Sequence, residues 1–178
     1  MSFMDLPKKF ANENTSYGCW LKVPSSITAE LAAISGFDYV CVDMQHGFSD
    51  RNDLLPMLQS IQPHSPKALV RVPGNEPSII GWVLDAGATG VIVPLINSAE
   101  EAEAAVRACL YPPKGNRSMG PTRALRVFGE KYVEEMENSV QCLPMIETLD
   151  ALENLDSILS VEGVDAIYVG PSDLSVNL

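Results

Sequence analysis

Two carboxylates end two apolar segments in the last third of the sequence. Glu147 closes the run at 142–146, and Asp173 follows the run at 165–169 after a Gly–Pro–Ser break. Both runs have the composition of buried strands, and neighbouring strands of a parallel sheet lie about 4.8 Å apart. The two acids could therefore share one divalent ion, Mg²⁺ or Mn²⁺ with Co²⁺ as a further choice, since such ions accept oxygen ligands. The alternative, which the residues alone leave level with this one, is that each acid caps a helix or faces solvent.

A histidine follows the strand-like run at 38–43, in the sequence Asp43–Met–Gln–His46. A carboxylate that holds one ring nitrogen of a histidine leaves the other nitrogen as a base near neutral pH. The spacing therefore allows Asp43 and His46 to form an acid/base pair. The alternative, which the residues alone favour, is a surface loop histidine without a chemical role.

Arg71 lies inside the apolar run at 68–72, which has the composition of a buried strand. Burying an unpaired charge is costly. We therefore expect Arg71 either to pair with a neighbouring acid or to bind a carboxylate or enolate oxygen, two interpretations of equal weight. Three further arginines lie in a segment rich in proline and glycine. We expect them to be solvated loop charges, although one of them could meet an anionic substrate: Arg117, Arg123 and Arg126.

Six apolar runs alternate with helix-like segments along the chain. The predicted strands cover residues 17–23, 38–43, 68–72, 91–95, 142–147 and 165–169. Helices are predicted over 26–34, after Ser49, over 75–87, from Ser98, over 130–136 and over 149–163, with none after the last strand. The segment 111–126 has too much proline and glycine for a helix or a strand. Trp20 and Phe48 fall near the predicted loops and could line a pocket, although core packing is the default for aromatic side chains.

Alternation of strands and helices predicts a parallel sheet that is covered by helices. The candidates are a doubly wound open sheet and a (β/α)8 barrel. A doubly wound dinucleotide fold would place a glycine-rich turn after the first strand, and none is present there. Polar residues instead recur at the carboxyl ends of strands, which is typical of barrels. We therefore predict a TIM-type (β/α)8 barrel, as one domain over residues 1–178, of which only about six β/α units are present because a complete barrel takes about 250 residues.

Composition excludes several classes of partner. The chain of 178 residues has a formal net charge of −11, which argues against a nucleic-acid partner and against binding to anionic lipid. No apolar run approaches the roughly 20 residues of a membrane span, and the first residues lack the pattern of a signal peptide.

The four cysteines follow no metal-ligand spacing and are expected to be buried thiols of a cytoplasmic protein: Cys19, Cys41, Cys109 and Cys142.

In combination, several motifs resemble the HpcH/HpaI aldolase/citrate lyase family, and in particular its class II (metal-dependent) pyruvate aldolases. They span nearly the whole chain and read G-C-W-L at 18–21, F-D-Y-V-C-V-D-M-Q-H at 37–46, V-R-V-P at 70–73, L-D-A-G-A-T-G-V-I-V-P at 84–94, Y-P-P-K-G-N-R-S-M-G-P at 111–121, P-M-I-E-T at 144–148 and V-G-P-S-D-L-S at 169–175. The resemblance implies the barrel of the phosphoenolpyruvate/pyruvate superfamily. It also implies a homo-oligomer.

The resemblance further implies the roles of individual residues. Glu147 and Asp173 would be the metal ligands, and His46, assisted by Asp43, would be the acid/base group. Arg71 would contact the keto or enolate oxygen. The carboxylate of the substrate would bind near the end of the last strand, and the implied substrate-binding residues are Trp20, Arg71, Gly170, Pro171, Ser172 and Asp173.

The implied reaction is the cleavage of a 4-hydroxy-2-oxo acid to pyruvate and an aldehyde, or its reverse. An alternative within the same superfamily is a lyase acting on citramalyl-CoA or malyl-CoA, which would need a basic nucleotide pocket. An alternative from another class is a non-catalytic partial barrel. Two departures from the family pattern are Met145, where many members have glutamine, and the absence of two further strand–helix units.

Overall fold

A computed structural model describes residues 15–64 and 67–178 of the chain. The expectation about a signal peptide concerns residues outside these ranges. Six strands form one sheet, and every pairing in it is parallel. They are β1 (Gly18–Leu21), β2 (Tyr39–Asp43), β3 (Lys67–Arg71), β4 (Gly90–Val93), β5 (Gln141–Ile146) and β6 (Tyr168–Val169).

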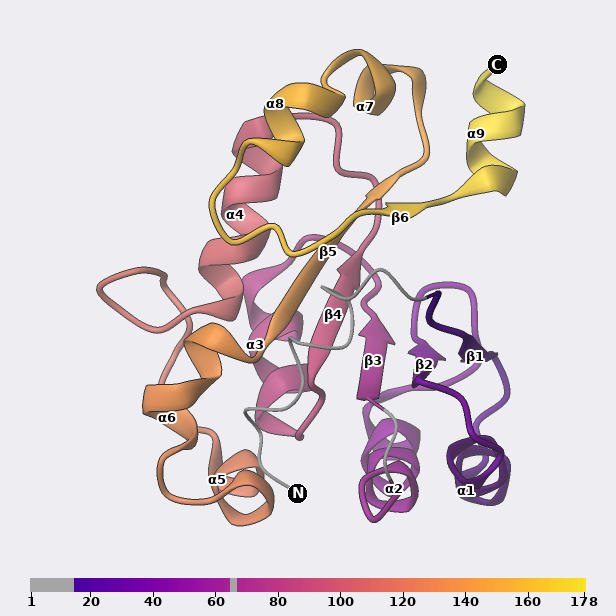
Figure 1. The fold of residues 1–178 in the computed structure, drawn as a ribbon, viewed down its shortest axis with the longest axis vertical. Coiled ribbons are helices and arrows are strands. Elements are labelled where there is room, and N and C mark those ends of the chain that lie inside the picture. The colour runs from indigo at the N-terminus through magenta and orange to yellow at the C-terminus, as the bar shows by residue number, and fades with distance from the viewer. Residues whose placement is uncertain (1–14, 65–66) are drawn as a thin grey trace.

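The strands follow one another in the sheet in the same order as in the sequence, from β1 to β6. A doubly wound sheet would reverse its strand order at a switch point, so this alternative is excluded. Figure 1 shows the strands side by side with helices α1 to α4 around one face, as in part of a barrel wall. The predicted α/β fold with parallel strands is confirmed as a curled half-barrel of six strands.

The helices begin where the sequence offers a capping side chain. Ser25, Asp50, Ser98 and Thr148 each accept a hydrogen bond from a backbone N–H in the first turn of the helix that follows, which satisfies a donor that the helix itself leaves free. The helices are α1 (Ser26–Ile34), α2 (Arg51–Ile61), α3 (Pro77–Asp85), α4 (Ala99–Cys109), α5 (Thr122–Phe128), α6 (Tyr132–Glu135) with a 3₁₀ turn at Met136–Asn138, α7 (Leu149–Glu153), α8 (Leu155–Leu159) and α9 (Pro171–Asn177).

Three predictions about these elements are wrong in part. The segment 111–126 was expected to be irregular throughout, but α5 begins at Thr122, since the prolines and glycines end at Pro121 and the next seven residues can all be helical. The helix expected over 149–163 is divided at Asn154, which has φ −97° and ψ 9°. Strand β6 contains two residues rather than five, and helix α9 follows it where no helix was expected.

The two faces of the sheet carry separate apolar clusters, because side chains alternate along each strand. Val40 and Val42 of β2 belong to the large cluster between the sheet and the helices. Cys41, which lies between them in the sequence, belongs to a small cluster on the inner face with Leu69, Ile92, Leu143 and Met145. The inner face is the one that a barrel encloses.

Arg117 corrects another prediction. It was expected to be a solvated loop charge, but its side chain is buried. The guanidinium lies 2.6 Å from a carboxylate oxygen of Asp85 on α3, donates to the hydroxyl of Tyr132 at 3.1 Å and stacks 4.7 Å from the ring centroid of Tyr111. A paired charge can be buried at moderate cost. Through its ion pair with Asp85, Arg117 attaches the proline- and glycine-rich segment at 111–121 to α3.

The other two arginines of this segment behave differently from each other. Arg123 is half-buried and donates to the carbonyl of Ala86 and to the side chain of Gln62, so the expectation of a solvated charge is wrong for it also. Arg126 is exposed, as predicted.

Two expectations from composition concern membrane spans and the four cysteines. Among the described residues, no helix is both long and apolar enough to cross a membrane. All four cysteines are free thiols, and three of them are buried, whereas Cys19 is half-buried.

Candidate active site

The candidate site lies where the strands end. Trp20 of β1, Asp43 of β2 and Arg71 of β3 occupy the carboxyl-terminal parts of their strands, Glu147 directly follows β5, and Asp173 lies in the first turn of α9. A pocket of about 250 Å³ opens between these elements, and the residues that line it are Trp20, Lys22, Arg71, Met145, Tyr168, Gly170, Pro171, Ser172 and Asp173. The structure thus brings most of the predicted site residues to one pocket.

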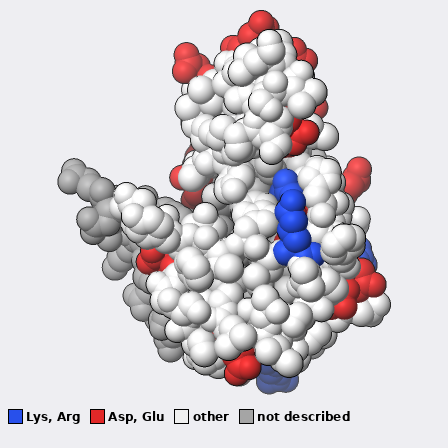
Figure 2. All heavy atoms as spheres, turned by 90° about the vertical axis from the view of Figure 1, so that its right-hand side faces the viewer, with Lys and Arg blue, Asp and Glu red and all other residues white. Residues whose placement is uncertain are grey.

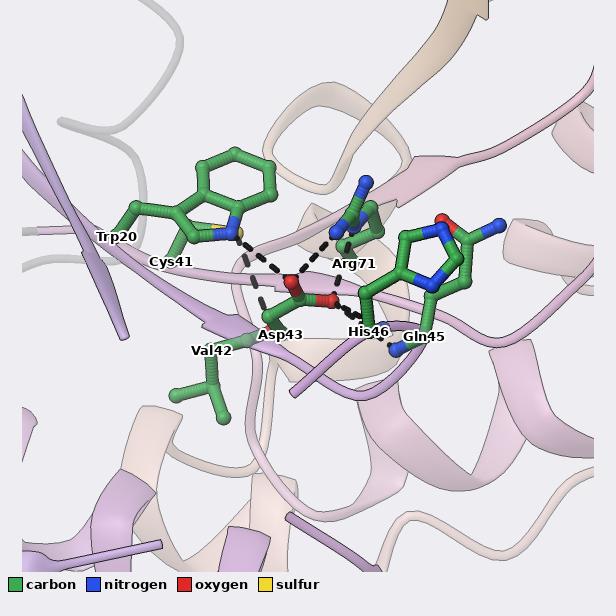
Figure 3. A network of polar contacts seen from close by, with 7 residues as sticks. All are labelled: Trp20, Cys41, Val42, Asp43, Gln45, His46 and Arg71. Carbon is green, nitrogen blue, oxygen red and sulfur yellow. Dashed lines mark hydrogen bonds and ion pairs between the residues drawn. The ribbon is translucent and has the colours of Figure 1, made fainter. Parts of the chain in front are cut away.

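Asp43 is fully buried and is the centre of a hydrogen-bond network (Figure 3). Its Oδ1 accepts from Nε of Arg71 at 2.9 Å, and its Oδ2 accepts from NH2 of Arg71 at 2.5 Å and from Nε1 of Trp20 at 3.1 Å. The backbone N–H groups of Gln45 and His46 also donate to Oδ1. These five hydrogen bonds fill the roughly four lone-pair positions of a carboxylate.

The same network sets the charge of Asp43. Burial alone would raise the pKa of the carboxyl group, but the hydrogen bonds from Arg71, from the backbone of His46 and from Trp20, together with the charge of Arg71, hold the pKa well below its ordinary value. Asp43 is therefore ionised at neutral pH. Of the two interpretations of Arg71, the structure shows the pairing with a neighbouring acid.

The expected pairing of the Asp43 carboxylate with the ring of His46 is wrong. The hydrogen bond between them comes from the backbone N–H of His46, and the carboxylate has no free position for the ring. Figure 3 shows the imidazole turned away from Asp43, beside Gln45. The side chain of His46 is exposed, so Asp43 shapes the loop that carries the histidine and does not orient its ring.

Arg71 keeps part of its donor capacity for the pocket. A guanidinium has five N–H donors, of which Asp43 takes two. The guanidinium also lies 5.1 Å from the centroid of the Trp20 ring, and that ring lies 5.0 Å from the ring of Tyr168. Aromatic contacts on one side and the carboxylate on another hold Arg71 in one orientation, with its remaining donors available to a bound molecule.

Trp20 and Phe48 differ from each other in their packing. Trp20 is half-buried: it packs against the small apolar cluster on the inner face and also lines the pocket, so both expectations for it hold. Phe48 is 81% exposed and belongs to neither apolar cluster.

Glu147 is buried at the end of β5. Two neighbouring residues, Leu95 and Gly170, adopt backbone positions that accommodate its carboxylate. Its Oε1 accepts the backbone N–H of Leu95 at 2.8 Å, and Leu95 has a positive φ of 55°, which is uncommon for a residue with a branched side chain. Gly170 packs against the same carboxylate, since a Cβ at this position would lie 2.6 Å from Oε2 of Glu147. Residues in strained backbone conformations cluster at functional sites.

Asp173 is the second acid of the site, and its charge affects the pKa of Glu147. Burial raises the pKa of Glu147, the hydrogen bond from Leu95 opposes this, and the neighbouring carboxylate of Asp173 raises the pKa further. Two neighbouring carboxylates repel each other electrostatically, and a divalent cation bound between them would relieve this repulsion, since such cations accept carboxylate oxygens as ligands. Among the described residues, no group of three or more His, Cys, Asp or Glu side chains could hold a metal ion, so these two would need backbone, water or substrate oxygens as further ligands.

Sequence reasoning missed several residues that line the pocket or shape it. Lys22 was assigned to the first strand, but β1 ends at Leu21 and Lys22 lines the pocket. The rule that polar residues at strand ends are candidates would have found it had the strand end been placed correctly. Leu95 offers no such signal, because a positive φ at a leucine cannot be recognised in a sequence.

Comparisons with known proteins identify relatives of this chain. The family model described as HpcH/HpaI aldolase/citrate lyase matches residues 16–178. The chain is 42% identical over 159 residues to a hydroxypyruvate/pyruvate aldolase of Rhizorhabdus wittichii, covering 89% of this chain and 63% of that protein. It is 41% identical over 165 residues to a 2-dehydro-3,6-dideoxy-6-sulfogluconate aldolase of Pseudomonas putida, covering 92% of this chain and 65% of that protein.

A solved structure shows the same arrangement of elements. It is an HpcH/HpaI aldolase from Desulfitobacterium hafniense, with a TM-score of 0.87, 31% identity and coverage of 97% of this chain and 68% of that one. The chain spans less than two thirds of the length of the two curated relatives named above. With a family model that matches nearly all of the described residues, and with the resemblance of the motifs confirmed, the chain belongs to the HpcH/HpaI aldolase/citrate lyase family.

Proposed function

We propose that the protein containing this chain catalyses the divalent-metal-dependent aldol cleavage of 4-hydroxy-2-oxo acids to pyruvate and an aldehyde, or the reverse condensation. The chain would form the larger part of a (β/α)8 barrel that carries the site. The observation that supports the proposal most is one pocket in which Arg71 and Asp173 are lining residues and Glu147 lies directly behind Gly170. Two of the relatives, named as aldolases, point to the same reaction type.

The donor set suits a hard divalent ion. Glu147 and Asp173 would hold it through carboxylate oxygens, as Mg²⁺ and Mn²⁺ prefer. The raised pKa of Glu147 reflects a buried carboxylate beside another acid, and a cation between the two would remove that penalty. Lewis-acid polarisation of the keto group is the chemistry that such an ion supplies when bound.

The residues of the chain would divide the remaining work. The backbone N–H groups of Ser172 and Asp173, after Gly170 and Pro171, would receive the carboxylate of the 2-oxo acid. The proton of the 4-hydroxyl group would pass to His46, directly or through water, as the C3–C4 bond breaks. The electron pair of that bond would form the C2=C3 double bond of the enolate, and the π pair of the keto group would move to its oxygen, where the free N–H donors of Arg71 would stabilise the negative charge. Protonation at C3 would then give pyruvate.

The test is release of pyruvate from a panel of 4-hydroxy-2-oxo acids by the full-length protein. We expect release to stop on addition of EDTA and to return with Mn²⁺ or Mg²⁺. Glu147→Gln and Asp173→Asn should each abolish turnover and weaken Mn²⁺ binding, measured by calorimetry, whereas Glu153→Gln on the exposed face of α7 should change neither. Activity that survives both EDTA and the two substitutions would refute the proposal.

A further inference from the structure

Glu147, the acid that follows β5, is hidden from solvent and only 1% exposed. Figure 2 shows one face of the molecule, on which basic atoms lie in a hollow and most acidic atoms lie toward the edges. The direction of a buried carboxylate is set by hydrogen bonds from its neighbours, and groups that orient a metal ligand in this way affect metal affinity strongly. The contacts that hold these neighbours in place therefore matter for the proposed metal site.

The chain on both sides of the Glu147 carboxylate is attached to one residue, Asn97. On one side, Leu95 donates its backbone N–H to Oε1 of Glu147 at 2.8 Å, and the carbonyl oxygen of Leu95 accepts a hydrogen bond from Nδ2 of Asn97 at 3.3 Å. On the other side, Thr148 directly follows Glu147, and its hydroxyl donates to Oδ1 of Asn97. One amide side chain thus connects the donor of the carboxylate with the residue next to the carboxylate in the sequence.

The backbone of Asn97 is fixed as well. Its N–H donates to Oε2 of Glu101 on α4 at 2.6 Å, and its carbonyl oxygen accepts from Nδ2 of Asn154 at 2.9 Å. Asn97 and Thr148 are 51 residues apart in the sequence, so these contacts join the loop after β4 to the loop after β5. The two strands are neighbours in the sheet, and their loops cannot shift relative to each other without breaking the contacts of Asn97.

Helix capping does not account for this arrangement. The N-caps of α4 and α7 are Ser98 and Thr148, and each accepts a backbone N–H of its own helix. Within the described part of the chain, the hydrogen bonds of the Asn97 side chain go instead to Leu95 and Thr148. A positive φ, such as the 55° of Leu95, persists only where surrounding contacts maintain it. The amide of Asn97 supplies such a contact.

We propose that Asn97 is a positioning residue: by holding the chain on both sides, it aims the carboxylate of Glu147 at the metal ion. The inference rests on the proposed function, in which Glu147 and Asp173 share that ion. Asn97 acts through its neighbours. Without its amide, the N–H of Leu95 and the peptide after Glu147 move independently, and the carboxylate loses its fixed direction. Loss of a group that orients a ligand typically lowers metal affinity by about 10- to 100-fold.

The test measures the affinity of the full-length protein for Mn²⁺ by calorimetry. Asn97→Ala should raise the Kd about 10-fold, and Thr148→Val, which lacks the hydroxyl, should do the same. The Kd of the double variant should lie within about 2-fold of that of Asn97→Ala, because both substitutions remove the contact between these two side chains. Thr148→Ser keeps the hydroxyl and should stay within about 2-fold of the wild type.

Ser25→Ala is the matched control. Thr148→Val also removes the N-cap of α7, and Ser25→Ala removes the corresponding cap of α1, which lies at the opposite end of the molecule in Figure 1. Its loss of stability should be similar, but its Kd for Mn²⁺ should stay within about 2-fold of the wild type. In the metal-free protein, hydrogen exchange at residues 95–97, measured by mass spectrometry, should become faster in Asn97→Ala and not in Ser25→Ala.

The outcomes separate this inference from the proposed function. Wild-type Mn²⁺ affinity in both Asn97→Ala and Thr148→Val, alongside loss of binding in Glu147→Gln, would overturn the inference and leave the proposed function standing. Unchanged hydrogen exchange in Asn97→Ala, or an equal rise of the Kd in Ser25→Ala, would overturn it also. If Glu147→Gln binds Mn²⁺ as the wild type does, both the proposed function and this inference are wrong.

Discussion

Asp43 and Arg71 are register partners on adjacent strands, β2 and β3, and their side chains form a buried ion pair with N–O distances of 2.9 and 2.5 Å. The pair therefore follows directly from the alignment of the two strands. It fixes the guanidinium at the base of the pocket and gives a clear first prediction.

Asp43→Asn should destabilise the fold by about 3–5 kcal/mol, because it leaves the buried charge of Arg71 without a counter-ion. Urea unfolding, followed by circular dichroism, measures the loss. Asp156→Asn, which removes a charge from the exposed surface of α8, should change the free energy of unfolding by less than about 0.5 kcal/mol. Similar effects of the two substitutions would show that the pair does not contribute to stability.

His46 and Arg71 should prove separable, because an imidazole can transfer protons near neutral pH and a guanidinium cannot. We expect His46→Ala to lower kcat about 10²-fold or more and to leave Mn²⁺ binding and stability unchanged, since its ring makes no contact with Asp43. Arg71→Lys should lower kcat/KM and stability together, as an ammonium group cannot reproduce the two-point contact. Wild-type kcat/KM in both variants would place the site elsewhere.

Gly170→Ala should disturb the site although the backbone of Gly170, with φ −94°, is open to alanine. The added Cβ would lie 2.6 Å from Oε2 and 2.7 Å from Cβ of Glu147, so the carboxylate must move. Loss of a group that orients a ligand typically lowers metal affinity by about 10- to 100-fold, and calorimetry with Mn²⁺ measures it. Gly74→Ala is the matched control, because nothing lies within 4 Å of its Cβ.

Glu147→Gln should stabilise the metal-free protein, and more so at higher pH. Burial raises the pKa of Glu147 above its ordinary value of 4.5, so the folded state holds this proton at a pH where the unfolded state has lost it. Stability from this group is therefore lost as the pH rises from about 4.5 through the raised pKa. Thermal unfolding at pH 5 and pH 8 in EDTA should show a larger gain for the glutamine variant at pH 8. A gain that is equal at both pH values would contradict the assignment.

A polypeptide of these 178 residues alone should associate in solution. Strands β1 and β6 each have one partner strand within the described sheet, and Ile27, Leu31 and Ile34 form an exposed apolar stripe along α1. Unpaired strand edges and apolar patches both promote association. Sedimentation velocity measures the size, and Leu31→Lys should reduce association more than Leu159→Lys on α8. A compact, active monomer at all concentrations would contradict this prediction.

The sequence predicted the parts of this structure that depend on local pattern. Apolar runs placed all six strands, and the capping residues Ser25 and Ser98 placed the starts of two helices. For α2 the predicted cap was Ser49, one residue before the observed cap Asp50. Charged residues in apolar runs pointed to Arg71 and Glu147. The order of strands in a parallel sheet then brought their carboxyl ends together, as the candidate site requires.

What could not be predicted depends on contacts between distant segments. Arg117 looked like a loop charge because Asp85 and Tyr132, its partners, are 32 and 15 residues away in the sequence. The proximity of Asp43 and His46 along the chain suggested a side-chain contact, but the tight loop after β2 presents the backbone of His46 instead. Closeness in the sequence indicates that two residues can be in contact, but it does not determine whether the contact is made by the backbone or by the side chain.

Leu95 connects the surface of the molecule with a buried acid. Its side chain is 53% exposed, yet its backbone N–H is the group that donates to the buried carboxylate of Glu147, at 2.8 Å. The backbone conformation of Leu95, with its positive φ, sets the direction of that hydrogen bond. The loop after β4 thus contributes to the proton affinity of Glu147, because the donor that it orients lowers the pKa of this buried acid.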